Sequence, residues 1–543
     1  MPVELGLLIL SLLFFVSIFT DKVGSRFGIP ALLLFLVVGM LFGPEGVSSW
    51  FGSKSVAFSI DVGSAQAMST IALSVILFSG GLNTSIGDIR PVAGPGVTLA
   101  TLGVLLAAFI TGGIIYFVLG WIPAMKTITF AFALLMASTM SSTDSASVFS
   151  ILRTRSISLK HNLQPLLELE SGANDPMAYI LTITLIGIVT AGKGVEISAL
   201  ELVQEVFIQL VVGAVLGYIF GKIAIFLLKN VSLSNESLYP LMIFTFCIFS
   251  FAASYYMRGN PYLAVYISGL VIGNTKFVRK RQTTSFFDGL TWLSQLLMFL
   301  MLGLMVRPSA FLHLNVWLPC VIISLVMMFI ARPAAVWLSL APFGNQFNNV
   351  DKLFISWVGL KGAVPIIFAI LCMANEVPQS ELVFNVGFLC TLVSLLAQGS
   401  SLTKVANSLH LATPRPKEKR LVYFDIDLPE EIQTSASEIM IKESDLANGN
   451  QIKDLSLPQK TLIIMVRRGE SFFVPVGTSV LMKGDQLLLI SDRAAKEAER
   501  KIDEDDEFDL NQWSEEMKAK IQTKVQQHKE QLLKLKEKSH NNL

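Results

Sequence analysis

The chain has 543 residues with 42 Lys and Arg and 41 Asp and Glu, so its net charge of +1 gives no reason to expect a nucleic-acid partner. The charges are unevenly divided, because 38 lie among the first 412 residues and 45 among the last 131. Uncharged runs long enough to cross a lipid bilayer recur in the first part. This composition excludes a secreted enzyme, a fibrous protein and a disordered chain. It predicts an all-α polytopic membrane protein with a small α+β cytoplasmic domain.

The apolar segments predict about thirteen transmembrane helices. Lys and Arg number twelve in the loops after odd-numbered segments and five in the loops after even-numbered ones. By the positive-inside rule, this places the N-terminus outside and the C-terminal domain in the cytoplasm. The expected location of the helices is a bacterial inner membrane. The expected spans are 3–20, 29–43, 65–82, 93–120, 127–150, 168–191, 201–228, 238–256, 261–275, 287–306, 313–340, 351–373 and 379–409.

The organisation expected along the chain has four parts: a transmembrane domain at 1–412, a linker at 413–419, a soluble domain at 420–497 and a charged tail at 498–543. In the soluble domain, Arg467–Glu470 is typical of a hairpin turn between two β-prone runs. The expected strands are Leu421–Ile426, Glu438–Lys442, Thr461–Val466, Ser471–Val474 and Gln486–Ser491, with a short helical stretch near Gly449–Leu455.

Two of the expected spans are interrupted, and each interruption carries a charge. Asp144 lies within the polar run Ser141–Ser145, and Lys361 lies between two glycines, shortly before Pro365. A charge at mid-bilayer costs at least about 2.5–3.5 kcal/mol, and a broken helix survives in lipid only where it lines a cavity. The two interruptions are therefore expected to form part of a polar site.

The interrupted segments are the fifth and twelfth spans, so they cross the membrane in opposite directions. Paired, inverted interrupted helices are typical of the substrate site of a secondary transporter. Asp144 is expected to balance the amino-terminal helix ends there, and Lys361 the carboxyl-terminal ends. The alternative is a pair of structural kinks lined by polar residues by chance, which does not explain why both carry a charge.

The sixth span begins with Glu168–Pro176, which supplies several oxygen ligands suited to a hard cation. Ser171 and Asp175 are four residues apart and share a helix face, as do Glu170 and Asn174. A competing interpretation is a helix cap at the membrane surface. It explains Glu168 but not Asp175, which lies beyond the first turn of a helix that starts near Gln164.

Asp175 is the predicted exchange group, because a lone carboxylate in such a site holds either a proton or a metal ion. Alternating access then exchanges one for the other. Glu170 is expected to form an ion pair with Lys361, since opposite buried charges tolerate each other better than either alone. Arg332 is expected near the membrane surface, where its long side chain reaches water.

The first part of the chain, about residues 1–405, resembles the monovalent cation:proton antiporter-1 family, of NhaP type. The resemblance is carried by Thr143-Asp144, by Glu170–Pro176 and by Gly359–Pro365. It implies a homodimeric potassium(sodium)/proton antiporter with thirteen spans, inverted repeats and two broken, crossing helices. Such a protein takes part in pH homeostasis.

The same resemblance implies roles for individual residues. It places Asn174 and Asp175 at the ion site and associates this pair with electroneutral exchange of one cation for one proton. Glu170, Ser171 and Thr143 match positions that line the site in the family. The family commonly has arginine where this chain has Lys361, and lysine lacks the bidentate fork of arginine.

The C-terminal part resembles the TrkA-C domain, also called RCK-C. The resemblance is carried by Asp454–Pro458, Val466–Gly469, Gly477-Thr478 and Lys483–Leu487. No G-x-G-x-x-G unit precedes these residues, so the nucleotide-binding half of that module is not expected. The resemblance implies a dimerising regulatory domain at 420–497 with a small ligand, in some relatives a cyclic dinucleotide or another nucleotide. Antiporters that carry it are typically potassium:proton antiporters.

Together these features predict a potassium/proton antiporter and not an enzyme, without a cofactor. Potassium and sodium are not distinguished by the sequence, so a sodium/proton antiporter of the same fold is the alternative, and a symporter is also left open. A ligand-gated cation channel is the remote alternative, since no Thr-Val-Gly-Tyr-Gly filter occurs. An intramembrane protease is disfavoured because no Gly-x-Gly-Asp motif is present.

Overall fold

The computed structural model divides the chain into two compact units, Met1–Arg415 and Pro416–Leu543. The predicted strand Leu421–Ile426 and the predicted tail 498–543 lie outside the residues that it describes. Those residues are 4, 8, 11–19, 31–46, 60–121, 128–155, 157–191, 199–277, 279–312, 314–344, 346–414, 436–443, 446, 449–455, 461–469 and 471–491.

The first unit is mostly helical, and its helices follow the predicted segments in chain order. Eight described helices are long and apolar enough to cross a membrane, and four more are apolar but shorter. The helices are α2 (Ala31–Phe42), α4 (Val62–Asn83), α5 (Ile86–Ile89), α6 (Ala93–Thr98), α7 (Val104–Gly120), α8 (Phe130–Thr139), α9 (Ser145–Thr154), α10 (Leu163–Thr190), α11 (Ala199–Asn230), α12 (Leu238–Tyr256), α13 (Pro261–Gly273), α14 (Lys280–Met305), α15 (Leu314–Val326), α16 (Arg332–Ser339), α17 (Asn349–Trp357), α18 (Val364–Ala374), α19 (Ser380–Ser394) and α20 (Ser400–Ser408).

Several of these helices are joined by short segments of different pitch. Three π-helical segments, η2 (Leu99–Gly103), η5 (Met327–Ala331) and η7 (Leu395–Gly399), connect α6 to α7, α15 to α16 and α19 to α20. A π-helical turn inserts a residue, which rotates the side chains that follow it around the helix axis. The sequence prediction contained none of them. Short 3-10 helices η1 (Arg90–Val92), η4 (Pro308–Leu312) and η6 (Ala341–Phe343) complete the unit.

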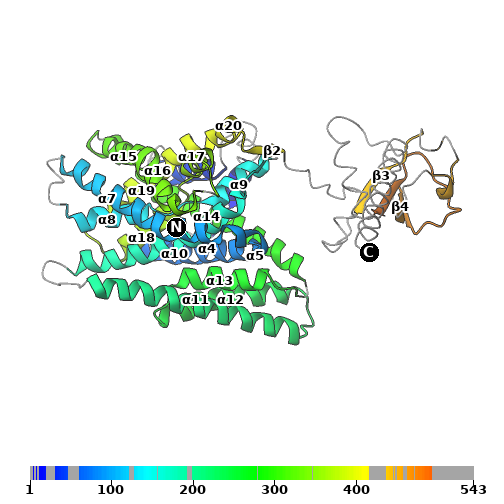
Figure 1. The fold of residues 1–543 in the computed structure, drawn as a ribbon, viewed down its shortest axis with the longest axis horizontal. Coiled ribbons are helices and arrows are strands. Elements are labelled where there is room, and N and C mark those ends of the chain that lie inside the picture. The colour runs from blue at the N-terminus through cyan, green and yellow to red at the C-terminus, as the bar shows by residue number, and fades with distance from the viewer. Residues whose placement is uncertain are drawn as a thin grey trace, which may run out of the picture. The chain divides into compact units, whose positions relative to one another are not determined.

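The helices pack in two groups. Helices α11, α12, α13 and α4 pack on one another, and α14 joins them to α2; α11, α12 and α13 run side by side in Figure 1. Helices α8, α10, α18 and α19 form the centre of the second group. The groups meet where α10 packs against α13 and α18 against α4. Within the first group a Cβ on Gly81 of α4 would lie 2.3 Å from the Tyr266 carbonyl oxygen of α13, so this close crossing requires glycine.

A two-stranded antiparallel ribbon in the first unit was not predicted. Strand β1 (Ile157–Leu159) lies between α9 and α10, and it pairs with β2 (Ala412–Pro414), which follows α20. The predicted linker at 413–419 therefore starts inside a strand. A ribbon of this length has little stability of its own, and its two halves lie about 250 residues apart, so no local pattern marks it.

The second unit contains a four-stranded antiparallel sheet in the order β3-β6-β4-β5. The predicted strands at 438–442, 461–466, 471–474 and 486–491 are confirmed. The predicted hairpin between the second and third of them in chain order is confirmed as well. The predicted helical stretch is a short 3-10 helix, η9 (Ile452–Asp454). The strands are β3 (Ala436–Met440), β4 (Thr461–Arg468), β5 (Ser471–Phe473) and β6 (Gln486–Ser491).

An ion pair between the partly exposed Arg468 and the buried Asp485 joins this sheet to the loop after β5. Arg468 donates to both carboxylate oxygens of Asp485, at 2.8 and 2.6 Å, and the Met482 N–H donates at 2.8 Å. Burial acts to raise the pKa of the Asp485 carboxyl, but these hydrogen bonds and the guanidinium charge hold that pKa below its usual range. The stabilisation is complete above the pKa of the unfolded carboxyl and is lost as the pH falls through the lower folded pKa.

We therefore expect Asp485→Asn to lower the hydrogen-exchange protection of β4 and β6 amides in the full-length protein at pH 6. At a pH below the folded pKa, variant and wild type should approach each other. The control is Glu443→Gln, which removes an exposed pair with Lys483 and should leave protection unchanged. Wild-type protection in Asp485→Asn at pH 6 would contradict this prediction.

Candidate functional site

Two helix interruptions meet at the centre of the first unit. Residues 140–144 are not helical and separate α8 from α9, and residues 358–363 separate α17 from α18. The Asp144 N–H donates to the Leu360 carbonyl oxygen at 2.8 Å, so the two interruptions are hydrogen-bonded to each other. A Cβ on Gly362 would lie 2.2 Å from Asp144 Oδ2, which shows that this close approach requires glycine. The structure thus brings together the two segments that the sequence singled out.

Each of the two charges at the interruptions contacts a helix end. Lys361 Nζ donates to the carbonyl oxygens of Ser142 and Ser141, at 2.8 and 3.3 Å, just beyond the carboxyl end of α8. Asp144 Oδ1 accepts from the Ser147 N–H in the first turn of α9, at 3.1 Å. A cation therefore lies at a carboxyl-terminal helix end and an anion at an amino-terminal one, where helix dipoles favour them.

Asp175 lies on α10 beside the first of these interruptions. Its side chain is buried, with 6% exposure, and its carboxylate accepts a hydrogen bond from the Ser142 hydroxyl. Asn174 Nδ2 donates to Thr143 Oγ1 at 2.6 Å. The Ser171 hydroxyl donates to the Thr143 carbonyl oxygen at 2.9 Å. Four of the predicted site residues are thus in one connected cluster.

The cluster combines one carboxylate with several neutral oxygens. Asn174 Oδ1 is buried and accepts no hydrogen bond from the residues that the structure describes. Hydroxyl, amide and carbonyl oxygens around a single carboxylate are ligands that hard cations prefer. Among the described residues, His, Cys, Asp and Glu form no group of three that could hold a transition metal.

The predicted ion pair between Glu170 and Lys361 is wrong. Glu170 Oε1 lies 2.6 Å from Arg332 Nη1, and both side chains are buried. The Lys361 amine is held instead by two carbonyl oxygens of the first interruption. Arg332 is only 6% exposed, so its side chain does not reach water as predicted. A planar guanidinium matches a buried carboxylate better than an amine does.

Local structure explains how Arg332 reaches Glu170. It is the first residue of α16, directly after the π-helical segment η5. A Cβ on Gly359 would lie 2.7 Å from Arg332 Nε, so the guanidinium passes over a position where only glycine leaves room. The Arg332 Nη2 group also donates to the Ile355 carbonyl oxygen of α17, at 3.4 Å. The pair thereby joins α10, α16 and α17.

Two residues at this site were missed by sequence reasoning. Ser142 contacts Asp175, but the sequence offered no basis for choosing it among the hydroxyls of the run Ser141–Ser145. Arg332 had a usable signal, because it is a lone arginine inside an apolar segment. Glu168 accepts a hydrogen bond from Gln164 within its own helix, at 3.0 Å.

Comparison with known proteins agrees with this geometry. The family model described as "Sodium/hydrogen exchanger, transmembrane" matches residues 9–408, and the TrkA-C domain model matches residues 436–503. The chain is 41% identical over 417 residues to the K(+)/H(+) antiporter NhaP of Alkalimonas amylolytica, covering 76% of this chain and 68% of that protein. It is 37% identical over 493 residues to the K(+)/H(+) antiporter NhaP2 of Shewanella oneidensis, covering 90% and 82%.

A solved structure shows the same fold. The sodium proton antiporter MjNhaP1 from Methanocaldococcus jannaschii superposes with a TM-score of 0.60 at 23% sequence identity, covering 74% of this chain and 100% of that one. The matching family model covers most of the chain, and the relatives include proteins well above 30% identity over most of their length. The chain therefore belongs to the sodium/hydrogen exchanger family, as a multi-pass membrane transporter with a C-terminal TrkA-C domain.

Proposed function

We propose that this protein exchanges potassium for protons across the bacterial inner membrane, one ion for one proton, through competition at Asp175. The observation that carries the proposal is the buried Asp175 carboxylate at the junction of two broken helices, surrounded by neutral oxygens. The charges of Lys361 and Asp144 are engaged with helix ends, and that of Glu170 with Arg332. Asp175 is then the group left to carry a proton in one direction and a cation in the other.

Potassium is proposed over sodium because both relatives above 35% identity described above are named K(+)/H(+) antiporters. A more distant relative, 26% identical over 371 residues, is the Na(+)/H(+) antiporter NhaP of Pseudomonas aeruginosa. Sodium is therefore the second candidate. Both ions suit the oxygen ligands at Asp175.

The proposed membrane arrangement has thirteen spans in inverted repeats, with the N-terminus outside and the TrkA-C domain in the cytoplasm. It is supported by the positions of the helices, in which the two broken segments α8–α9 and α17–α18 each count as one span. Their hydrogen-bonded interruptions support a crossing of broken helices. The functional unit is proposed to be a homodimer.

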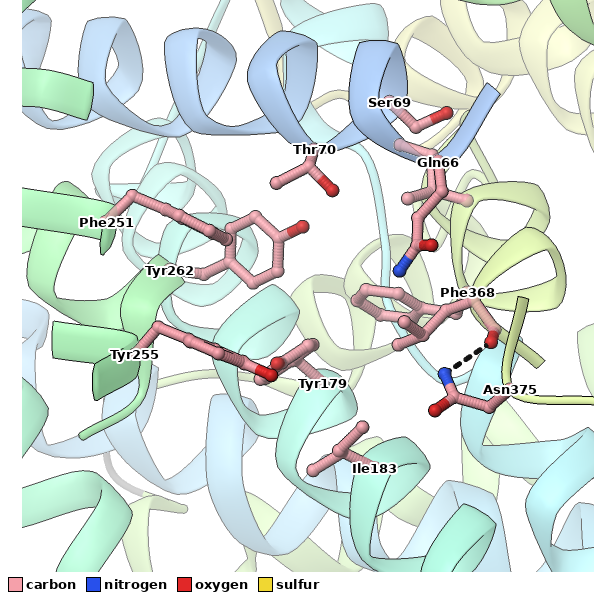
Figure 2. A pocket seen from close by; sticks show the side chains of 12 residues that line it. Gln66, Ser69, Thr70, Tyr179, Ile183, Phe251, Tyr255, Tyr262, Phe368 and Asn375 are labelled. Carbon is pink, nitrogen blue, oxygen red and sulfur yellow. Dashed lines mark hydrogen bonds between the residues drawn. The ribbon is translucent and has the colours of Figure 1, made fainter. Parts of the chain in front are cut away.

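A cavity lined in part by Tyr179, one helical turn beyond Asp175 on α10, is the proposed path for ions. It has a volume of about 270 Å³ and lies between α4, α12 and α13 on one side and α10 and α18 on the other. Figure 2 shows Tyr179 of α10 and Tyr262 of α13 next to each other in its lining. Tyr179 is four residues beyond Asp175 on α10, so the two side chains share a helix face. Asp175 does not itself line the cavity, and we propose that the cavity leads to it.

The test is ion-driven proton movement in proteoliposomes with an acidic interior. External potassium should alkalinise the interior, and equal concentrations of sodium should do so more weakly. Adding a potassium ionophore to clamp the membrane potential should not change the rate if exchange is electroneutral. A faster rate with sodium would favour the sodium alternative, equal rates would contradict a preference for potassium, and the absence of any ion-driven alkalinisation would contradict an antiporter.

Regulation is proposed to reach the site through the β1–β2 ribbon. The ribbon pairs β2, near the end of the first unit, with the loop between α9, which is capped by Asp144, and α10, which carries Asp175. Lys160 reinforces it, with its N–H donating to the Leu411 carbonyl oxygen at 3.1 Å and its Nζ to that of His410 at 3.0 Å. A displacement of β2 would thereby move β1 and, with it, the adjoining ends of α9 and α10.

We expect truncation after Arg415, which removes the TrkA-C domain but keeps β2, to preserve exchange and to shift its dependence on cytoplasmic pH. A flexible Gly/Ser insertion after Arg415 keeps the domain but joins it to β2 through a flexible linker. It should therefore produce the same shift in pH dependence. The measurement is the initial exchange rate as a function of pH. If the insertion kept the pH profile of the full chain, the ribbon would not be the route.

A further inference from the structure

Asn260 is a fully buried polar residue outside the Asp175 cluster. It caps α13, because its Oδ1 accepts from the Leu263 N–H at 2.9 Å. Its Nδ2 donates to the Pro176 carbonyl oxygen of α10 at 2.7 Å. Its backbone N–H donates to the Gln209 carbonyl oxygen of α11 at 2.9 Å. One residue therefore connects three helices.

Capping alone does not require asparagine at this position. Serine, threonine and aspartate accept from a helix N-terminus about as well as asparagine does. Of these four residue types, only asparagine also offers an amide donor. That donor is used on Pro176, the residue directly after Asp175. The choice of Asn260 is thus explained by the contact to α10.

The first helix group holds Asn260 in place. A Cβ on Gly213 of α11 would lie 2.8 Å from the Asn260 carbonyl oxygen and 2.9 Å from its nitrogen. A Cβ on Gly259 would lie 2.9 Å from the Gly213 nitrogen. Two glycines therefore allow α11 and the start of α13 to pack backbone against backbone. Asn260 is fixed to α11 and α13, and its side chain reaches out of this group to α10.

The same contact sets one wall of the cavity. Tyr262, two residues after Asn260, packs edge to face against Tyr179 of α10, with ring centroids 5.0 Å apart. Both rings line the cavity (Figure 2). The position of α10 relative to α13 therefore affects where Asp175 lies relative to the cavity.

We propose that Asn260 is a positioning residue for ion exchange, and that its bond to Pro176 stabilises the access state in which Asp175 faces the cavity. This rests on the proposed exchange function. Losing the bond lowers the population of that state, and the apparent affinity for a cation supplied on the cavity side falls by the same factor. The affinity for a cation supplied on the opposite side does not fall.

The test compares Asn260→Asp and Asn260→Ser with wild type in proteoliposomes of defined orientation. Both variants keep a capping oxygen and lose the amide donor. The apparent KM for potassium on the cavity side should rise about fivefold, as one lost neutral hydrogen bond predicts, and the KM on the opposite side should not rise. The control is Asn274→Asp at the other end of α13, whose amide donates to the Thr84 carbonyl oxygen and not to α10.

Three results would overturn the proposal. The first is wild-type KM values on both sides in both Asn260 variants. The second is an equal rise on both sides, or a rise in Asn274→Asp as well. The third is failure of both Asn260 variants to fold, which would make Asn260 a structural cap. Absence of exchange by the wild type would instead contradict the exchange function itself.

Discussion

Asp175→Asn is expected to reduce ion-driven proton movement to the level of protein-free liposomes. The amide has nearly the shape of the carboxylate and still accepts a hydrogen bond from Ser142, so the local structure should persist. It carries no charge and takes up no proton at physiological pH, so it neither binds a cation strongly nor carries a proton. The measurement is the rate of interior alkalinisation after addition of external potassium.

The matched control is Asp288→Asn on α14, which removes a carboxylate whose described partner is the Asn83 amide at 3.1 Å. It should exchange at the wild-type rate. If Asp175→Asn exchanged normally, Asp175 would not be the exchange group. Loss of exchange caused by misfolding of a variant would be recognised by size-exclusion chromatography in detergent.

Much of the fold follows from elementary physical chemistry of the sequence. A bilayer sets the length of its helices, so long uncharged runs predict α4, α11 and α12 closely. The π-helical segments and the β1–β2 ribbon depend on contacts between distant parts of the chain, and no local pattern marks them. Ile157 pairs with Pro414, for example, across more than 250 residues.

Charged and polar residues within apolar spans identified the segments that form the candidate site. Asp144 and Lys361 stood out because each interrupts an apolar segment, and the structure places both interruptions side by side. Side-chain pairing was not predictable in the same way. Whether Lys361 or Arg332 meets Glu170 depends on the rotation of α16 after a π-helical turn and on the space above Gly359. The sequence alone reveals neither.

Breaking the pair between Arg332 and Glu170 is expected to destabilise the membrane unit strongly. Arg332→Gln leaves Glu170, which is 1% exposed, without its cation, and removing one partner of a buried pair costs about 3–5 kcal/mol. We expect a marked fall in the midpoint of thermal unfolding in detergent and in the yield of folded protein. Glu170→Gln should have a similar effect, because it leaves the buried Arg332 guanidinium without its counter-ion.

The double variant Glu170→Gln/Arg332→Gln separates loss of the pair from loss of either side chain. It leaves no uncompensated charge, so it should be more stable than either single variant, although each change alone is harmful. Strictly additive losses of stability would show that the two side chains act independently. Recovered stability without recovered exchange would assign the pair a second role, because it joins α10, which carries Asp175, to α16 and α17. Rescue of both properties would mean that the pair only compensates buried charge.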